Sequence, residues 1–408
     1  MRFDLFVAPI LSPSVSKRYS CRMNSVHVAT SPLAKINTPA AVIDVARMEA
    51  NIARMQARMN VLGVRFRPHV KTSKCVDVVR LQEAAGASGI TVSTLKEAGQ
   101  FFAAGIADIF YAVGMAPHKL PQTAALIAAG CRLRILVDNL AAAQAVAAYA
   151  NAHGIAFAVL IEIDTDGHRS GVKPEALALL AIAHALVAAP QVTLVGVMTH
   201  AGASYDFDDA ASLQRIAEQE RALCVRAATR LREAGFACRE VSVGSTPTAL
   251  SAQTLDGVTE VRAGVYVFFD LVMTNIGVCG LDDIALSVLT TVIGHQHEKN
   301  WLIADAGWMA MSRDRGTLKQ RVDYGYGRVC DAAGQPVDGC QMVSANQEHG
   351  IIEWRDEVSS QSIEARFPVG TQLRILPNHA CATGAQFPEY VALSRDGAIT
   401  SWPRFYGW

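Results

Sequence analysis

The chain has 408 residues, of which 51% are hydrophobic and 18% charged, a composition typical of a globular protein and not of a disordered one. Lys and Arg together number 37, as do Asp and Glu, so the formal net charge is zero and gives no electrostatic case for nucleic acid or an anionic membrane as partner. The length predicts a large barrel with a second domain, or two to three ordinary domains, and the partner is expected to be a small molecule.

The cysteines and the N-terminus predict a protein of the reducing cytoplasm. The nine cysteines are scattered without a CxxC pair, so a disulfide scaffold is not expected. Residues 1–35 are expected to form a poorly ordered extension. Asp4, Pro9 and Pro13 do not suit a secretion signal, and Met23 is an alternative start. No run reaches about 18 apolar residues, so no membrane-spanning helix is expected.

From residue 44 onward, alanine-rich segments with helical periodicity alternate with short β-branched runs, a pattern typical of βα units. Long helices are expected at residues 45–59, 139–153, 175–189 and 208–234. Eight strands are expected at residues 64–71, 89–94, 108–113, 132–138, 156–164, 193–200, 240–246 and 260–268. The fold class is therefore α/β, a (β/α)8 TIM-type barrel over residues 36–274. A doubly wound open sheet is the alternative, but the GxGxxG turn that it requires does not follow the first strand.

Strand-like runs without helical segments follow residue 275 and predict a C-terminal β-rich domain over residues 275–408. The segment 37–44 is also strand-like. Because it precedes the barrel, we expect it to pair into the second domain. The other strands expected in this domain lie at residues 284–295, 301–305, 372–376 and 390–393.

The run RPHVKTSK closes the first expected strand and places Lys71 at its carboxyl end, where barrel active sites gather. Arg67, His69 and Lys74 are close to it in sequence, and apolar runs flank the segment on both sides. Crowded positive charge and an apolar setting both favour the neutral amine, which can attack a carbonyl and hold it as a Schiff base. The alternative is a rim lysine with its charge in water.

The seventh and eighth strands end in segments that suit a phosphate group. Gly244, Ser245 and Thr246 begin the run GSTPT, which offers backbone and hydroxyl donors, and Gly264 allows close approach of the backbone. These two strands form the usual phosphate site of a barrel. A turn ended by a proline is the alternative for GSTPT. Together with Lys71, the two segments predict a phosphorylated carbonyl cofactor, pyridoxal 5'-phosphate.

Two other strand ends carry residues that suit the cofactor ring. Arg169 follows a turn permitted by Gly167 after the fifth strand, and can contact a phenolate oxygen of the ring. Thr199 and His200 end the sixth strand. His200 is a candidate to stack on the ring or to bond it, and a histidine satisfied at the barrel mouth is the alternative.

The second domain carries a candidate metal pair in the run PNHACATG. His379 and Cys381 are two residues apart, so on an extended strand both side chains point to the same face and can share one ion. Nitrogen and sulfur donors favour Zn²⁺, with Mn²⁺ and Mg²⁺ as alternatives, and two protein ligands leave positions open for water and substrate. A histidine and a cysteine at this spacing also occur by chance, so the pair alone is a weak signal.

The ordered set RPHVKTSK, DTDGHRSGV, THAG, GSTPT, AGVYVFFD, NQEHG and PNHAC resembles the fold-type III pyridoxal-phosphate enzymes, and among them the D-serine dehydratase family. The resemblance covers residue 36 to the C-terminus. It implies an alanine-racemase-like barrel with a β-domain, usually a homodimer. It further implies that Lys71 is the Schiff-base lysine and that His379 and Cys381 bind a divalent metal. The cofactor-binding residues that go with it are His69, Arg169, Thr199, His200, Gly244, Ser245, Thr246, Gly264, Val265 and Tyr266.

The resemblance implies a carbon–oxygen lyase that converts a D-3-hydroxy amino acid to a 2-oxo acid and ammonia. Within the family the chain is most similar to D-threo-3-hydroxyaspartate dehydratases, so this substrate, which gives oxaloacetate, is expected first and D-serine, which gives pyruvate, second. A β-carboxylate requires a cation or a donor near the metal. The candidates by resemblance and composition are His349, Asn346 and Arg313.

Three other functions remain as alternatives: a racemase, an aldolase and a non-catalytic cofactor-binding protein. Alanine racemases of this fold use a tyrosine of the second domain and have no such metal pair, so the pair favours a lyase. D-Threonine aldolases are similar to the chain but tend to carry an aspartate at the position of Cys381, which favours dehydration over aldol cleavage. The alternative of another class is a non-catalytic pyridoxal-phosphate homeostasis protein, and such proteins usually consist of the barrel alone.

Overall fold

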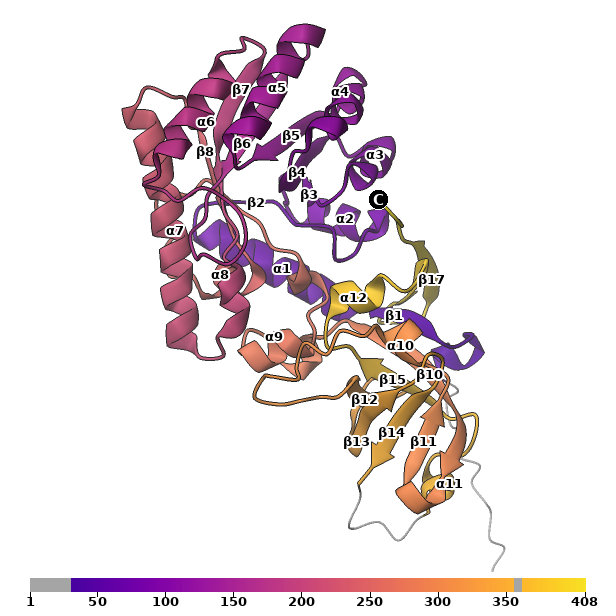
Figure 1. Ribbon diagram of the computed structural model, residues 1–408. Helices are drawn as coiled ribbons and strands as arrows, with labels where there is room; N and C mark the ends of the chain where they lie inside the picture. The colour runs from indigo at the N-terminus through magenta and orange to yellow at the C-terminus, as the bar shows by residue number, and fades with distance from the viewer. Residues whose placement is uncertain (1–30, 356–361) are drawn as a thin grey trace, which may run out of the picture. The chain divides into compact units, whose positions relative to one another are not determined.

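A computed structural model describes residues 31–355 and 362–408, so the expected poorly ordered extension lies almost entirely outside the described residues. The unit Pro32–Trp408 contains an eight-stranded parallel sheet and a nine-stranded sheet (Figure 1). In the part of the chain that the structure describes, no helix combines the length and apolar character needed to cross a membrane.

The eight-stranded sheet is parallel throughout and runs in the order β2-β9-β8-β7-β6-β5-β4-β3. A parallel bridge between His69 and Thr91 joins its two edges, so the sheet curls round until they meet. The barrel fold expected from the sequence is confirmed. Its strands are β2 (Arg65–Phe66), β3 (Ile90–Val92), β4 (Asp108–Gly114), β5 (Arg132–Val137), β6 (Phe157–Glu162), β7 (Val192–Met198), β8 (Glu240–Val243) and β9 (Glu260–Val261).

The strands β2 and β9 are two residues long, much shorter than the sequence predicts. Pro68 has no N–H to give to a ladder, and it follows β2 closely. After β9 the chain turns at Gly264 into a 3-10 helix at Val265–Val267. Both early ends lie beside the cavity described below, where the backbone must leave the ladder to reach a ligand.

Helices connect the barrel strands, and short polar residues begin the longest of them. The side chains of Asp44, Asn139 and Asp209 each accept a hydrogen bond from the N–H three residues further on, which satisfies a free donor of the first turn. The helices of this region are α1 (Val45–Val61), α2 (Val76–Ala84), α3 (Leu95–Ala103), α4 (Leu120–Ala128), α5 (Leu140–His153), α6 (Leu177–Val187), α7 (Ala210–Glu233), α8 (Thr246–Ser251) and α9 (Leu271–Ile276).

The second sheet is antiparallel except for one pair and runs in the order β11-β14-β13-β12-β15-β10-β1-β16-β17. The segment 37–44, expected to pair into this domain, contains β1, which lies between β10 and β16. Three short helices accompany the sheet, α10 (Trp308–Met311), α11 (Ile363–Arg366) and α12 (Ala380–Gly384). The strands are β1 (Ala40–Asp44), β10 (Leu286–Gln296), β11 (Trp301–Ala304), β12 (Gly327–Asp331), β13 (Pro336–Ala345), β14 (Gly350–Trp354), β15 (Gln372–Leu376), β16 (Glu389–Leu393) and β17 (Ile399–Pro403).

Part of the barrel interior is ionic. The guanidinium of Arg67 is fully buried, with Nε 2.8 Å from Glu260 and Nη1 2.8 Å from Asp108. Asp108 also pairs with Arg134 at 2.8 Å. A Cβ at Gly89 would lie 2.4 Å from Nη1 of Arg67, so the glycine makes room for the guanidinium. Because a buried charge is stable only when it is paired, these residues depend on one another.

Removing the charge of Arg67 leaves Glu260 buried without its ionic partner. We expect Arg67→Met, which keeps most of the side-chain volume, to lower the free energy of unfolding by about 3–5 kcal/mol. Urea unfolding followed by circular dichroism measures the change. The matched control is Arg226→Met, which removes an exposed pair with Glu175 and should have a much smaller effect. Equal losses in the two variants would contradict the interpretation.

Candidate active site

A cavity of about 770 Å³ lies where the barrel strands end, and a segment of the second domain, residues 314–321, forms part of its wall. The structure places most of the residues predicted from the sequence on this wall: His69, Lys71, Arg169, His200, Gly244, Ser245, Thr246, Gly264, Val265, His379 and Cys381. Five predicted residues are not among those that line it: Thr199, Tyr266, Arg313, Asn346 and His349.

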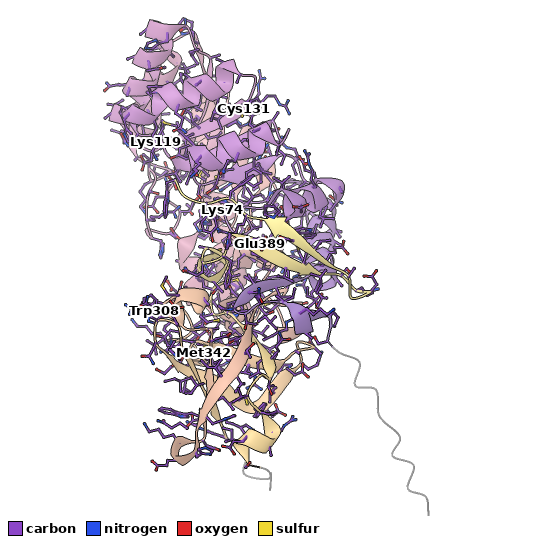
Figure 2. All side chains as sticks on the ribbon, turned by 90° about the vertical axis from the view of Figure 1, so that its right-hand side faces the viewer. Lys74, Lys119, Cys131, Trp308, Met342 and Glu389 are labelled. Carbon is purple, nitrogen blue, oxygen red and sulfur yellow. The ribbon has the colours of Figure 1, made fainter. Side chains whose placement is uncertain are left out.

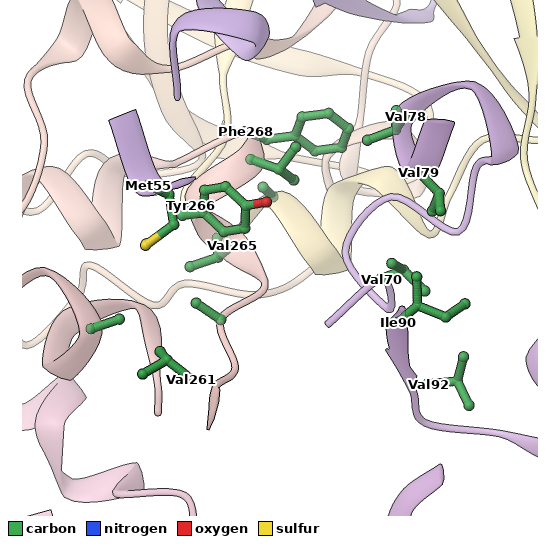
Figure 3. Close-up of a cluster of buried hydrophobic side chains, with 14 of the residues drawn as sticks. Met55, Val70, Val78, Val79, Ile90, Val92, Val261, Val265, Tyr266 and Phe268 are labelled. Atoms are coloured by element: carbon green, nitrogen blue, oxygen red, sulfur yellow. The ribbon is translucent and has the colours of Figure 1, made fainter. Parts of the chain in front are cut away.

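Lys71 lies in the turn that follows β2. Its neighbour Val70 is buried among the apolar side chains of α2 and β3, including Val78 and Ile90 (Figure 3). Lys71 itself is exposed and lines the cavity. Among the described residues its Nζ has no ion pair or hydrogen bond. A buried valine thus anchors the turn and leaves the amine free to react with a ligand in the cavity.

The expected crowding of cations around Lys71 is wrong for two of its neighbours. Arg67 points into the barrel interior, where it pairs with Glu260. Lys74, labelled in Figure 2, pairs with the buried Glu97 at 2.8 Å. His69 does line the cavity, and burial together with the charges of Lys71 and Arg262 holds its pKa well below the usual value. The imidazole beside Lys71 is therefore neutral.

Glycines shape the part of the wall expected to take a phosphate. Gly244 has a φ of +126°, and a Cβ there would lie 2.2 Å from the carbonyl oxygen of Arg262. A Cβ at Gly264 would lie 2.9 Å from the carbonyl oxygen of His69. The N–H groups of Gly264 and Val265 make no hydrogen bond within the described residues. Such paired free donors suit an anionic group.

Two predicted cofactor residues have other roles in the structure. The hydroxyl of Tyr266, labelled in Figure 3, accepts a hydrogen bond from Gln82 at 2.7 Å. Its ring packs edge-on against Phe66 and does not line the cavity. Thr199 is buried, and its hydroxyl lies 2.9 Å from that of Thr165. Both side chains support the wall from behind.

Arg262 lines the cavity and was not predicted from the sequence. It is 4% exposed, its Nε donates to Ser242 Oγ at 2.9 Å, and its Nη2 donates to the carbonyl of Thr199. Ser242 in turn donates to Glu260 at 2.9 Å, which links Arg262 to the ionic interior. The sequence signal was its position two residues before Gly264, because on the strand expected over residues 260–268 the two residues would share a face. The arrangement gives a fixed cation in the cavity wall.

His200 and Arg169 lie at the mouth of the barrel. Nδ1 of His200 is 3.1 Å from the carbonyl oxygen of Gly244, which can only accept, so Nδ1 carries the proton of the neutral ring. Burial lowers the pKa of His200 to about 3. His200 therefore offers Nε2 to the cavity as an acceptor. Arg169 is more exposed than His200, and its guanidinium contacts Glu162 at 3.5 Å.

The expectation that His379 and Cys381 share an extended strand is wrong. His379 has extended φ and ψ but is the residue before α12, and Cys381 lies inside this helix. The two side chains still interact. Burial disfavours both charged forms, yet attraction to Cys381 and Asp314 raises the pKa of His379 to about 11, and His379 lowers the pKa of the Cys381 thiol despite its burial. Without a metal, the pair therefore favours imidazolium and thiolate, and a bound metal would replace the proton on Nε2 of the ring.

The surroundings of this pair fit an open metal site. Nδ1 of His379 lies 2.6 Å from Asp314, an arrangement that fixes the ring and leaves Nε2 for a metal. Cys381 Sγ lies 3.1 Å from the hydroxyl of Thr72, the residue after Lys71. No group of three or more acidic, histidine or cysteine side chains suited to a metal occurs among the described residues. Two protein ligands would leave positions for water and substrate.

The neutral, buried state of His200 makes stability depend on pH. Below pH 6.5 the unfolded chain protonates this residue, whereas the folded chain does so only near pH 3, so protons favour unfolding in this window. We expect His200 to cost the cofactor-free protein about 1.4 kcal/mol of stability per pH unit below 6.5. Urea unfolding of the wild type and His200→Asn at pH 7.5 and 5.5 measures the difference. Equal losses in both proteins would contradict the assignment.

Two protein-family models match the chain, the alanine racemase N-terminal domain over residues 43–272 and the putative serine dehydratase domain over residues 285–393. A D-threo-3-hydroxyaspartate dehydratase of Delftia sp. (strain HT23) is 62% identical over 92% of this chain and 99% of that protein. The D-serine dehydratase of Dictyostelium discoideum is 30% identical over 89% of this chain and 95% of that protein.

Solved structures show the same relationship as the family models and the sequence relatives. D-threo-3-hydroxyaspartate dehydratase from Delftia sp. HT23 superposes with a TM-score of 0.91, at 62% identity over 93% of this chain and 100% of that one. A variant of a D-threo-3-hydroxyaspartate dehydratase, solved in a metal-free form, gives a TM-score of 0.90 over 92% of this chain and 99% of that one, also at 62% identity. The chain therefore belongs to the family that joins an alanine racemase N-terminal domain to a putative serine dehydratase domain.

Proposed function

We propose that the chain is a pyridoxal-phosphate- and divalent-metal-dependent dehydratase of D-3-hydroxy amino acids, with D-threo-3-hydroxyaspartate as the first substrate and D-serine as the second. The observation that carries the proposal is the 3.1 Å contact between Thr72, next to Lys71, and Cys381. The α-proton and the β-hydroxyl of the substrate are on adjacent carbons. A base for the one and a metal for the other must therefore lie side by side, as Lys71 and the His379–Cys381 pair do.

The residues of the barrel fit pyridoxal phosphate. Lys71 offers a free amine, Gly244 and Gly264 keep the wall open to a phosphate, and Arg262 provides a fixed cation. When bound, the cofactor supplies an electron sink for negative charge at the substrate α-carbon. Lys71 would hold the cofactor through its amine and, once displaced by the amino group of the substrate, take the α-proton.

The residues of the second domain fit a divalent metal, and their donor types favour Zn²⁺. His379 Nε2 and Cys381 Sγ would hold it, and Asp314 orients the imidazole. Hydroxide is a poor leaving group, and a metal supplies a Lewis acid for the departing β-oxygen. The same pair disfavours a racemase, which has no leaving group to activate. A cysteine rather than an aspartate at position 381 favours dehydration over aldol cleavage.

We also propose that the protein is a cytoplasmic homodimer and that its domains divide at residues 36–274 and 275–408. The two family models match within these limits, over residues 43–272 and 285–393. The family resemblance supports the dimer.

The proposed reaction is tested by its products. With pyridoxal phosphate and Zn²⁺, D-threo-3-hydroxyaspartate should give oxaloacetate and D-serine should give pyruvate, each with ammonia. Lys71→Ala should abolish both activities and the absorbance of bound cofactor, whereas Lys119→Ala, outside the cavity wall, should change neither. Glycine and glyoxylate without ammonia would show an aldolase instead.

The metal site is tested through Asp314, which contacts a ligand without being one in this proposal. Asp314→Asn keeps a polar group beside His379 but removes the charge that orients the ring. We expect Zn²⁺ affinity, measured by calorimetry, to fall about 10–100-fold. Asp323→Asn, two residues beyond the segment 314–321 and paired with Arg315, is the control and should leave the affinity unchanged. A chelator should stop oxo-acid formation by the wild type, and added Zn²⁺ should restore it.

A further inference from the structure

The cavity wall carries more positive charge than the proposed cofactor site uses. Its lining contains six lysines and arginines and four aspartates, so a net positive wall faces the ligand. Three of the six cations come from one segment of the second domain, residues 315–321 with the sequence RGTLKQR, between α10 and β12. These three are Arg315, Lys319 and Arg321.

Two of the three cations are not neutralised by their own segment. Arg315 pairs with Asp323 at 3.0 Å. Asp314, the other nearby carboxylate, bonds to His379. Lys319 and Arg321 have no ion pair within the part of the chain that the structure describes.

The segment is fixed to the residues beside the proposed metal. Asp314 contacts His379, and Thr317 Oγ1 donates to Asn378 Oδ1 at 3.1 Å. Nδ2 of Asn378 then donates to the carbonyl of Gly325 at 2.8 Å. The loop that carries Lys319 and Arg321 is thus bonded near both of its ends to residues 378 and 379. This places its cations on the metal side of the cavity and not on the phosphate side.

The chemistry of the substrate requires a cation on that side. In 3-hydroxyaspartate the β-carbon carries both the hydroxyl, which the metal would hold, and the second carboxylate. D-Serine has only hydrogen in place of this carboxylate. A group that recognises the β-carboxylate must therefore lie on the metal side of the cavity. Asp206 and Asp208 of the barrel also line the cavity, and they would repel a dicarboxylate if no cation opposed them.

We propose that Lys319 and Arg321 form the subsite for the β-carboxylate and so set the preference for a dicarboxylic D-3-hydroxy amino acid over D-serine. This inference rests on the proposed dehydratase function. It replaces the candidates from the sequence, because His349, Asn346 and Arg313 do not line the cavity. Arg313 instead lies over the ring of Trp308, 4.2 Å from its centre.

The test compares the two substrates in Lys319→Gln, Arg321→Gln and the double variant. A lost charge-assisted hydrogen bond should lower kcat/KM for D-threo-3-hydroxyaspartate about tenfold or more per substitution, mainly through KM. The value for D-serine should stay within about twofold, because D-serine has no group to lose the contact. Arg313→Gln is the matched control, since it removes one positive charge two residues before the segment 315–321, from a side chain that does not line the cavity. Its substrate ratio should equal that of the wild type.

Binding without turnover gives a second measurement. The affinity of the holoenzyme for succinate, measured by calorimetry, should fall in Lys319→Gln and Arg321→Gln, while that for butyrate should not. Equal losses of kcat/KM for D-threo-3-hydroxyaspartate and D-serine, or an unchanged affinity for succinate, would overturn the proposed subsite. If the wild type forms no oxo acid from either substrate, the dehydratase proposal fails, and succinate binding still decides whether the two cations hold a carboxylate.

Discussion

Three hydrogen bonds from the second domain hold the turn that carries Lys71, and the geometry of the whole site depends on them. Cys381 Sγ lies 3.1 Å from the hydroxyl of Thr72, the hydroxyl of Tyr390 donates to the carbonyl of Ser73 at 2.9 Å, and the N–H of Phe405 donates to the carbonyl of Lys74 at 2.7 Å. Since each of three consecutive residues after Lys71 is bonded across the domains, the amine is placed by both. Neither domain alone sets the distance between the lysine and the His379–Cys381 pair.

The charges of RPHVKTSK show how a buried charge selects its partner. Arg67 pairs with Glu260 and Lys74 pairs with Glu97. Of these three cations, only Lys71 forms no ion pair with a carboxylate among the described residues. An ion that leaves water is stable in the fold when a counter-ion and hydrogen bonds replace its hydration. The basic run is therefore not one cluster of like charge. Its cations point in different directions, and Lys71, which is unpaired within the described residues, faces the cavity.

The sequence predicted the features that depend on local periodicity. Helices such as α5 and α7 were found because apolar residues recur along them, and Lys71, His200 and Gly244 because strand ends meet at one face of a barrel. Pairings between distant residues were not predictable: Glu260 is 193 residues from Arg67, and no local pattern joins them. Lys319 and Arg321 were missed for a related reason, because an irregular segment has no period that shows which side chains face inward.

The failures at single residues have specific physical causes. His379 and Cys381 were expected on a strand, but the chain turns into α12 directly after His379, and Asp270 accepts a hydrogen bond from the N–H of Ala380 at that turn. Tyr266 was expected at the cofactor because the family resemblance implies that the segment Gly264–Val265–Tyr266 binds it. Its ring is apolar enough to pack into the core, and Gln82 satisfies its hydroxyl, so burial decides its direction. A motif thus locates a backbone segment more reliably than it assigns the side chains within it.

The two domains supply different kinds of recognition. On the barrel side, the wall offers the neutral N–H groups of Gly264 and Val265. The guanidinium of Arg262 is held there by its hydrogen bond to Ser242. The proposed metal ligands and the two unpaired cations belong to the second domain. Under the proposed function, the outcome of the reaction depends on which substrate bond is weakened after the α-proton leaves, and the metal side would decide this. A change of substrate or of leaving group would then require new residues mainly in the segments 314–321 and 378–381, while the cofactor site of the barrel could stay as it is.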